Sequence, residues 1–261
     1  MSHHPAPSVL GQTISNAEYN PEILDPLPRP QVDWEFPMVG HDDWVLHELS
    51  YLNKNGQPTL FEAALSYSAD TKYLIESKSF KLYLQGMHME RFESKDAFVK
   101  RVCKDISNAL DGDCEWSDAL PISILAGADS VVELDGFSTK IEQFTYDPDI
   151  LRLAPRAESG TEAHWAYRFH AFRSLCPVTQ QPDWATINIK GIGIAPDPEA
   201  IYRYLVSFRD HTGFHEQVVC MITQDILETS KTEALAVQGE FYRRGGIAIV
   251  PTRIYDPKNQ L

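Results

Sequence analysis

The chain has 261 residues, of which 43% are hydrophobic and 23% are charged, a composition typical of a globular protein with a buried core. Its formal net charge of −14 disfavours direct binding to nucleic acid, because few cations are left to neutralise phosphates. No stretch approaches the roughly 18 apolar residues of a membrane span, and the N-terminus lacks the basic and apolar pattern of a secretion signal. We therefore expect a cytoplasmic protein that binds a small molecule.

The first half of the chain contains a proline-rich segment, a strand and a helix. Residues 21–37 carry five prolines and are expected to form an extended arm. Residues 42–58 read as an apolar strand that ends in a turn at Asn55–Gly56. Residues 94–110 place apolar side chains at helical spacing behind Ser94, a good N-cap residue, and so predict a helix.

The second half offers a matching set of elements. Residues 200–216 are expected to be strand-like and residues 217–229 helical. When Tyr83–Leu84 is aligned with Tyr204–Leu205, Asp105–Ile106 falls within one position of Asp225–Ile226. This indicates a two-fold internal repeat of about 120 residues. The sequence therefore predicts two similar α+β halves, each with antiparallel strands and a pair of helices.

Four cysteines show no paired spacing, so reduced thiols are expected. Cys103 and Cys220 have apolar neighbours on the two matching helices and read as small core residues. Cys114 lies in a polar connection and reads as a loop cysteine. Only Cys176 stands in a proline-containing loop without a packing role, where it is either a buried structural residue or a reactive thiol.

A nucleophilic Cys176 requires a nearby base, and either His215 or Asp183 could supply it. His211 and His215 are also spaced so that, together with Cys176, they could bind zinc. Spacing alone does not choose between these alternatives.

Two glycine-containing stretches bear on cofactor binding. "GIGIA" (191–195) lacks the third glycine and the helix of a dinucleotide fingerprint, and it reads as a strand with small residues. "YRRGGIAIVP" (242–251) is either a solvated hairpin end or a phosphate contact, because glycine admits a close approach and Arg offers forked donors.

Four stretches together resemble one enzyme family: "ESKSFKLYL" (76–84), "LCPVTQQPDWA" (175–185), "SFRDHTGFHEQ" (207–217) and "RRGGI" (243–247). They are similar to signature motifs of NADPH-dependent 7-cyano-7-deazaguanine reductases, nitrile reductases of queuosine biosynthesis in tRNA modification. The order of the motifs resembles the long, two-half form of that family.

The resemblance implies an α+β fold of tandem tunnelling-fold (T-fold) modules, in which antiparallel sheets carry helices on one face and assemble into a barrel. It implies an extended arm over residues 1–38, a first half over 39–135 with the ESKSFK motif, and a second half over 136–261 with the Cys-Asp loop and the His-Glu motif. It also implies a homodimer whose ligand is a small deazaguanine, without direct contact to nucleic acid or membrane.

The resemblance further implies roles for individual residues. Cys176 would attack the nitrile carbon to give a covalent thioimide, Asp183 would donate a proton to the nitrogen, and His215 would orient the reacting centre. The residues implied to bind the substrate ring are Ile75, Glu76, Ser77, His215 and Glu216. Those implied to bind NADPH are Ser77, Lys78, Arg244 and Gly245, and no metal is expected.

Two alternatives stand beside this interpretation. One is a zinc-dependent cyclohydrolase on the same fold, with Cys176 and either His211 or His215 as ligands. The other is a non-catalytic module that binds a purine or pterin. Bound zinc would identify the cyclohydrolase. A non-catalytic binding module need not retain the thiol of Cys176.

Overall fold

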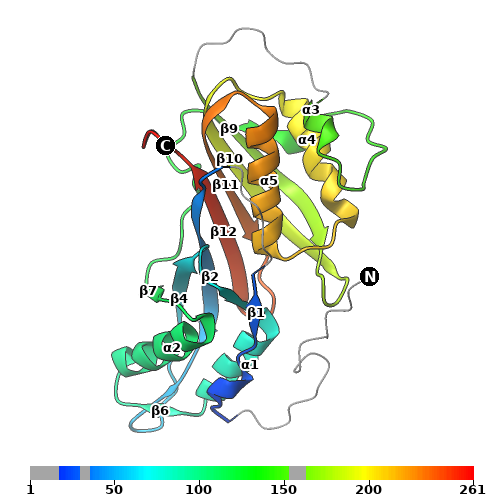
Figure 1. Ribbon diagram of the computed structural model, residues 1–261. Coiled ribbons are helices and arrows are strands. Elements are labelled where there is room, and N and C mark those ends of the chain that lie inside the picture. The colour runs from blue at the N-terminus through cyan, green and yellow to red at the C-terminus, as the bar shows by residue number, and fades with distance from the viewer. Residues whose placement is uncertain (1–17, 30–35, 153–162) are drawn as a thin grey trace. The chain divides into compact units, whose positions relative to one another are not determined.

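The computed structural model describes residues 18–29, 36–152 and 163–261, and it has a mixed α+β fold. These residues form two compact units (Figure 1). The described part of the first unit comprises residues 18–29, 43–121 and 243–248, and that of the second comprises 36–42, 122–152, 163–242 and 249–261. The predicted arm over residues 1–38 falls outside the described residues at 1–17 and 30–35.

Most of the elements of the first unit are short strands around two helices. In chain order they are η1 (Pro21–Ile23), β1 (Pro26–Pro28), β2 (Val39–Leu49), β3 (Leu52–Asn53), β4 (Phe61–Ser68), β5 (Tyr73–Ile75), α1 (Ser77–Met87), β6 (Arg91–Phe92), α2 (Lys95–Leu110) and β7 (Cys114–Ser117). Strand order in the main sheet runs β7-β4-β2, β1 pairs antiparallel with β5, and β3 pairs parallel with β6. The described part of the arm therefore includes a strand rather than being extended chain alone.

The helix predicted over residues 94–110 is confirmed as α2. The Ser94 hydroxyl accepts a hydrogen bond from the Ala97 N–H (3.2 Å) and so caps the first turn. One face of the helix is buried in the core, with Phe98, Val102, Ile106 and Leu110 at helical spacing. The predicted turn at Asn55–Gly56 is also present, and Gly56 adopts a φ of +78° that a side chain would disfavour.

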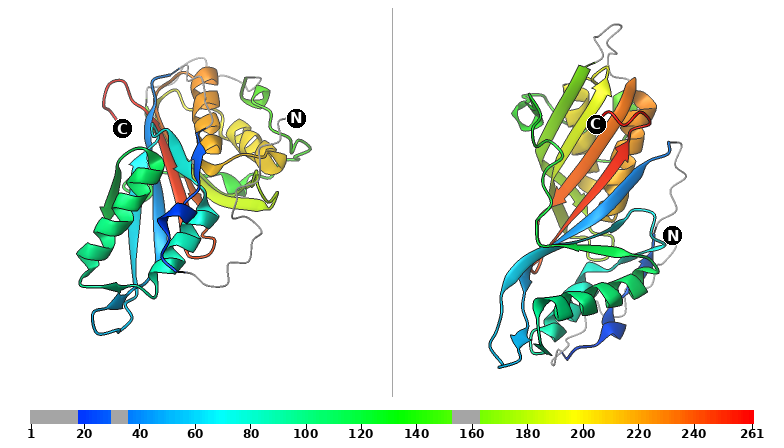
Figure 2. Two further views of the ribbon diagram at one scale, coloured as in Figure 1. Left: turned by 60° about the horizontal axis from the view of Figure 1, so that its bottom comes forward. Right: turned by 90° about the vertical axis from the view of Figure 1, so that its left-hand side faces the viewer.

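The second unit places helices on one face of a sheet. Its elements are β8 (Val132–Glu133), η2 (Leu134–Gly136), α3 (Asp149–Arg152), β9 (Ala163–Leu175), β10 (Pro182–Gly193), α4 (Pro198–Ser207), η3 (Phe208–Asp210), α5 (His215–Thr229), β11 (Thr232–Phe241) and most of β12 (Ile247–Tyr255). Strands β12, β11, β10 and β9 are neighbours in that order, and the β11–β12, β10–β11 and β9–β10 pairs are antiparallel. Figure 1 shows α4 and α5 over one face of these strands, and the right-hand view of Figure 2 shows the face that they leave uncovered.

The prediction of a strand over residues 200–216 is wrong. Pro198 stands in the first turn of α4, and the Asp197 carboxylate accepts a hydrogen bond from the Ala200 N–H (3.0 Å). The buried side chains recur at helical rather than alternating positions, namely Ile201, Tyr204, Leu205 and Phe208. The helix predicted over residues 217–229 is confirmed within α5.

The interpretation of Cys114 as a loop cysteine is also wrong, because this residue begins strand β7 opposite Tyr67. The short connection after α2 brings its Sγ within 3.5 Å of the Cys103 carbonyl oxygen and of the Ser107 hydroxyl. Cys103 is half-buried rather than a core residue, whereas the prediction that Cys220 is buried is confirmed.

Two equivalent clusters, which we call the tyrosine clasps, lie at matching places in the predicted repeat. In the first, the Asp105 carboxylate accepts hydrogen bonds from the hydroxyls of Tyr19 (2.8 Å) and Tyr83 (2.7 Å). In the second, Asp225 accepts from Tyr146 (2.7 Å) and from Tyr204. The matching chain segments "YNPEIL" (19–24) and "YDPDIL" (146–151) supply one tyrosine to each clasp. Each clasp thus joins a helix pair to a proline-containing segment earlier in the chain.

Burial keeps the tyrosines of the clasps protonated, as hydrogen-bond donors to a carboxylate must be. Burial and the Asp105 carboxylate raise the pKa of Tyr19 to about 12. Burial likewise raises the pKa of Tyr204 far above its usual value. The tyrosine hydroxyls therefore remain hydrogen-bond donors to the aspartate side chains near neutral pH.

Removal of the second carboxylate is expected to destabilise the fold. Asp225→Ala leaves two tyrosine hydroxyls without their acceptor, at a cost of about 1–3 kcal/mol for each buried donor. Chemical denaturation should show a free energy of unfolding lower by about 3 kcal/mol. The matched control Asp129→Ala, at an exposed position of the same unit, should leave it unchanged. Equal stability of the two variants would contradict the structural role of the clasp.

Candidate active site

Cys176 lies in the turn between β9 and β10, as its setting in the sequence predicts. The turn is closed by hydrogen bonds from the Cys176 N–H to the Gln181 carbonyl and from the Gln180 N–H to the Cys176 carbonyl, both 2.9 Å. Gln180 adopts a φ of +58°, which lets the chain reverse within these few residues. The thiol is partly exposed and so accessible to a ligand.

The Cys176 turn is fixed beside the start of α5 by the backbone. The Leu175 N–H donates to the His211 carbonyl (2.8 Å), and the Gly213 N–H donates to the Leu175 carbonyl (3.1 Å). This short parallel bridge places the residues just before His215 alongside the end of β9. Two segments that are far apart in sequence are thereby held together.

Asp183 and His215 form a buried pair. The Asp183 side chain is 2% exposed, and its Oδ2 lies 3.3 Å from the His215 Nε2. The His215 ring stacks on Phe241 of β11, with centroids 3.9 Å apart and planes inclined by 12°. Phe241 was not predicted from the sequence, and its position shows how the imidazole is held at one orientation.

Burial lowers the pKa of His215 to about 4, against a smaller opposing effect of the Glu216 carboxylate. The imidazole is therefore neutral near pH 7. A neutral imidazole and a carboxyl group in contact share a single proton, donated either by Nε2–H or by the acid. The pair can thus hold or pass a proton at one defined position. Glu216, the second residue of α5, is also buried at 5% exposure.

The residues predicted to bind substrate in the first half meet at the junction of β5 and α1. Ile75 is buried at the end of β5, whereas Ser77 and Lys78 are exposed at the start of α1. The Glu76 carboxylate is the N-cap, accepting hydrogen bonds from the N–H groups of Lys78 (2.9 Å) and Ser79 (2.6 Å). Its burial raises its pKa, an effect that these two hydrogen bonds oppose.

The arm fixes the backbone of this junction. The Glu76 N–H donates to the Asp25 carbonyl (2.9 Å), and the Asp25 N–H donates to the Ser79 hydroxyl (3.0 Å). Pro26 pairs with Ile75 in the register of β1 and β5. The Asp25 and Ser79 contacts were missed from the sequence, because neither residue belongs to a recognisable binding pattern.

Arg244 and Gly245 lie in the tight turn that follows β11. Arg244 and Ile247 exchange backbone hydrogen bonds of 2.8 and 3.3 Å, and the two glycines between them have φ values of +57° and +85°. This is the two-residue type I′ geometry that Gly-Gly favours. The turn belongs to the first unit, as do Ser77 and Lys78.

The predicted site residues thus form two groups. Cys176, Asp183, His215 and Glu216 belong to the second unit. Ile75, Glu76, Ser77, Lys78, Arg244 and Gly245 belong to the first. The first group supplies a thiol with a proton-holding pair, and the second supplies a buried carboxylate, two exposed cations and a glycine turn.

The zinc alternative receives no support from the geometry. His211 packs against Tyr146 and Phe208, at centroid distances of 5.3 Å, and its burial lowers its pKa. Within residues 18–29, 36–152 and 163–261, the one group of three ligating side chains that converge within 4.8 Å lies elsewhere, at Glu133, Asp135 and His170.

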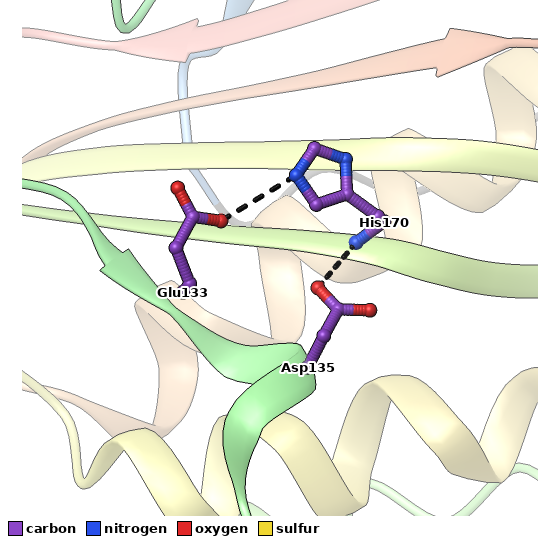
Figure 3. Close-up of side chains that lie close together, drawn as sticks. All are labelled: Glu133, Asp135 and His170. Atoms are coloured by element: carbon purple, nitrogen blue, oxygen red, sulfur yellow. Dashed lines mark hydrogen bonds and ion pairs between the residues drawn. The ribbon is translucent and has the colours of Figure 1, made fainter.

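In that exposed group the His170 Nε2 lies 3.5 Å from a Glu133 carboxylate oxygen, and the His170 backbone N–H donates to Asp135 (Figure 3). Glu133 pairs with Arg168 (2.8 Å), and the Asp135 carboxylate accepts hydrogen bonds from the N–H groups of His170 (2.8 Å) and Ala171 (3.0 Å). These contacts attach η2 to β9, which explains the cluster without a metal ion.

Comparison with protein families gives the class. Residues 15–117 match the family described as "Nitrile reductase, 7-cyano-7-deazaguanine-reductase N-term", and residues 182–260 match a family described as "QueF-like protein". The first of these descriptions names the class, the nitrile reductases. None of the helices that the structure describes is long and apolar enough to cross a membrane.

Full-length relatives narrow the class to one family. This chain is similar to three proteins named NADPH-dependent 7-cyano-7-deazaguanine reductase. It is 35% identical to that of Xylella fastidiosa (strain M12), 37% to that of Xanthomonas campestris pv. campestris (strain B100) and 36% to that of Burkholderia vietnamiensis (strain G4 / LMG 22486). The alignments cover 94%, 95% and 96% of this chain and 92%, 93% and 94% of those proteins. The chain belongs to the family of NADPH-dependent 7-cyano-7-deazaguanine reductases.

Among solved structures, the apo form of the archaeosine synthase QueF-Like is 16% identical to this chain, and the alignment covers 36% of this chain and 95% of the synthase chain. Its TM-score of 0.30 is too low to bear on fold or function.

Burial of His215 predicts a defined pH dependence of stability. Its pKa is about 4 in the folded protein and about 6.5 in the unfolded chain, so the unfolded state binds more protons between these values. The stabilisation is complete above about pH 6.5 and is lost as the pH falls towards 4, by up to about 3 kcal/mol.

Denaturation of wild type and His215→Gln between pH 4.5 and 7.5 tests this expectation. The difference between their free energies of unfolding should shrink as the pH falls, because only wild type carries the depressed imidazole. A constant difference across this range would contradict a neutral buried His215.

Proposed function

We propose that this protein reduces the nitrile of 7-cyano-7-deazaguanine to the primary amine of 7-aminomethyl-7-deazaguanine, with NADPH as reductant, in queuosine biosynthesis. The observation that carries the proposal is the Cys176 turn, bridged to the start of α5, in the same unit as the buried Asp183–His215 pair. Its membership of the reductase family supplies the substrate class and cofactor.

Cys176 is the proposed nucleophile. The thiol gives up its proton, the sulfur bonds to the nitrile carbon, one π bond of the C≡N triple bond breaks, and the nitrogen takes up a proton to give a covalent thioimide. A C=N thioimide is a better hydride acceptor than a nitrile. The partial exposure of Cys176 supports this role, because a ligand must reach the sulfur.

Asp183 is the proposed proton donor to the nitrile nitrogen, and His215 is proposed to orient the reacting centre. The 3.3 Å contact and the stacking of His215 on Phe241 support the assignment, since they fix where the proton is held. NADPH, when bound, supplies hydride in two successive transfers, so that four electrons convert nitrile to amine. Release of the amine requires the carbon–sulfur bond to break, which returns the thiol of Cys176.

Glu76 and Glu216 are proposed to accept hydrogen bonds from the N–H edge of the deazaguanine ring, with His215, Ile75 and Ser77 completing the pocket. Both carboxylates are at least nine-tenths buried, which strengthens hydrogen bonds to a ligand. The Glu76 oxygens already accept from the helix N-terminus, but an ionised carboxylate has about four acceptor positions and so retains capacity.

Ser77, Lys78, Arg244 and Gly245 are proposed to bind NADPH. Lys78 and Arg244 are exposed cations of the first unit, and such groups suit phosphate. The left-handed backbone of Gly245 supports a close approach of ligand to the turn.

We also propose that residues 39–135 and 136–261 are tandem T-fold modules behind an arm over 1–38, and that a cytoplasmic homodimer assembles them into a barrel. The duplicated tyrosine clasps and the helices on one face of the second unit's sheet support this assembly.

Replacement of the thiol tests the covalent step. Wild-type protein mixed with 7-cyano-7-deazaguanine in the absence of NADPH should gain the mass of the ligand by intact-protein mass spectrometry, and NADPH should discharge the adduct. Cys176→Ala should form no adduct and show no turnover while still binding the nitrile. Cys114→Ala, the control thiol, should behave as wild type. Turnover by Cys176→Ala at the native rate would refute covalent catalysis.

Asp183→Asn tests the proton donor. The expected result is a kcat lower by about 100-fold or more, because general acid catalysis typically contributes 10²–10⁴-fold. The dissociation constant of the nitrile, measured by calorimetry, should change only a few-fold. An unchanged kcat would exclude Asp183 as the proton donor.

A further inference from the structure

Ser174 is a buried residue of the second unit to which none of the roles above applies. It lies near the end of β9, two residues before Cys176, and it is 0% exposed. Among the residues that the structure describes, its hydroxyl has no hydrogen-bond partner. A buried hydroxyl without a partner is unfavourable for folding, so its presence at this position requires a reason other than stability.

The register of the sheet places Ser174 directly opposite Asp183. The two residues are partners in the antiparallel β9–β10 ladder, next to the Leu175–Pro182 pair from which the Cys176 turn projects. Opposite residues of such a ladder point to the same face of the sheet, with Cβ atoms about 4.5–5.5 Å apart. At that separation a hydroxyl and a carboxyl group come within hydrogen-bond reach by rotation of the side chains.

The face that they share carries the proton-holding pair. Phe172 and Ala185, the next residues of the two strands on this face, belong to the hydrophobic core that includes the buried side chains of α4 and α5. His215, at the start of α5, places its Nε2 3.3 Å from the Asp183 Oδ2. Ser174 therefore faces the carboxyl group of Asp183 from β9, whereas His215 faces it from α5.

Loss of a proton changes what Asp183 requires of its surroundings. The ionised group only accepts hydrogen bonds, and a negative charge on a side chain that is 2% exposed is costly unless donors face it. The neutral imidazole of His215 can supply one donor, through its Nε2–H. The hydroxyl of Ser174 is a second donor, and none of the described residues engages it.

We propose that Ser174 is a positioning residue for the proton donor. Its hydroxyl donates a hydrogen bond to the Asp183 carboxylate as the proton leaves for the nitrile nitrogen, and it keeps its own proton throughout. Such a bond stabilises the transition state more than the resting enzyme, where catalytic hydrogen bonds are often long or poorly aligned. This inference rests on the proposed function, because it requires Asp183 to be the proton donor.

Ser174→Ala removes the hydroxyl with little change in volume. Wild type and variant are mixed with 7-cyano-7-deazaguanine in the absence of NADPH, and adduct formation is followed over time by intact-protein mass. The rate should fall about tenfold or more, as expected for a lost hydrogen bond to a charged group. Ser174→Thr, which keeps the hydroxyl, should react at nearly the wild-type rate.

The dissociation constant of the nitrile separates this role from a direct contact with substrate. Calorimetry in the Cys176→Ala background, where no adduct forms, should show a change of less than about twofold when Ser174→Ala is added. An unchanged adduct rate in Ser174→Ala would overturn the proposal. So would a loss confined to the dissociation constant.

Stability separates a positioning role from a packing role. Because the Ser174 hydroxyl has no partner at rest, Ser174→Ala should melt at the temperature of wild type or above it. The matched control is Ser207→Ala, at another 0% exposed serine, whose hydroxyl donates to the Tyr204 carbonyl (2.7 Å). It should show the opposite pattern, with a lower melting temperature and the wild-type adduct rate. A Ser174→Ala variant that melts earlier and loses activity in proportion to its unfolded fraction would overturn the proposal.

The Asp183→Asn background tests whether Ser174 acts through Asp183. The amide donates no acidic proton, so removal of the Ser174 hydroxyl should slow this variant by less than a further twofold or so. A further loss of about tenfold would show that Ser174 acts independently of Asp183, and it would overturn the proposal.

The outcomes distinguish this inference from the proposed function. If wild type forms the adduct and NADPH reduces it, but Ser174→Ala reacts equally fast, the role of Ser174 is overturned and the reductase stands. If wild type forms no adduct and oxidises no NADPH, the proposed function fails and this inference fails with it.

Discussion

A carboxylate that accepts hydrogen bonds from two tyrosines organises each half of this protein. Asp105 and Asp225 stand at matching positions on α2 and α5, and each joins its own helix to the preceding helix and to a proline-containing segment. The helices fixed in this way begin with the residues of the proposed site. α1 starts directly after Glu76, and α5 starts with His215 and Glu216. Burial raises the pKa of Tyr19 and of Tyr204, which keeps these donors protonated near neutral pH.

The site residues differ in burial. Asp183 is 2% exposed and His215 is 16% exposed, which suits the proposed role of this pair in holding a proton at a fixed atom. Ser77, Lys78 and the Arg244–Gly245 turn are exposed, as suits a cofactor that binds and leaves during two reductive half-reactions. Glu76 is a special case, because the same carboxylate caps α1 and is proposed to bind substrate. Its hydrogen bonds to the helix N-terminus oppose the burial that raises its pKa, which favours the ionised acceptor.

Much of this organisation could be predicted from the sequence, and the failures have physical causes. The α2 helix followed from apolar periodicity and Ser94, and the repeat followed from the pairing of Tyr83 with Tyr204. Residues 200–216 were mistaken for a strand, although Asp197 and Pro198 are a helix start, because the dense apolar and aromatic side chains resemble those of a strand. Cys114 was misplaced because the sharp turn after α2 depends on the left-handed backbone of Asp111, which composition does not reveal.

The candidate site, like the fold, could be predicted from the sequence only in part. Motifs identified the chemical groups, since cysteine, histidine and carboxylates are recognisable in their local patterns. Their supports were not predictable, because Phe241 under His215 and Asp25 behind Glu76 are brought there by strand pairing. An alignment of "YNPEIL" with "YDPDIL" would have revealed the second tyrosine of each clasp.

The central claim is that this chain reduces a nitrile to an amine with NADPH. The most direct measurement follows NADPH absorbance and product mass together, in a reaction of purified protein with limiting 7-cyano-7-deazaguanine. The account predicts two NADPH oxidised for each nitrile consumed, and a product that carries four additional hydrogens. NADPH left unoxidised, or a product formed by addition of water rather than hydrogen, would contradict it.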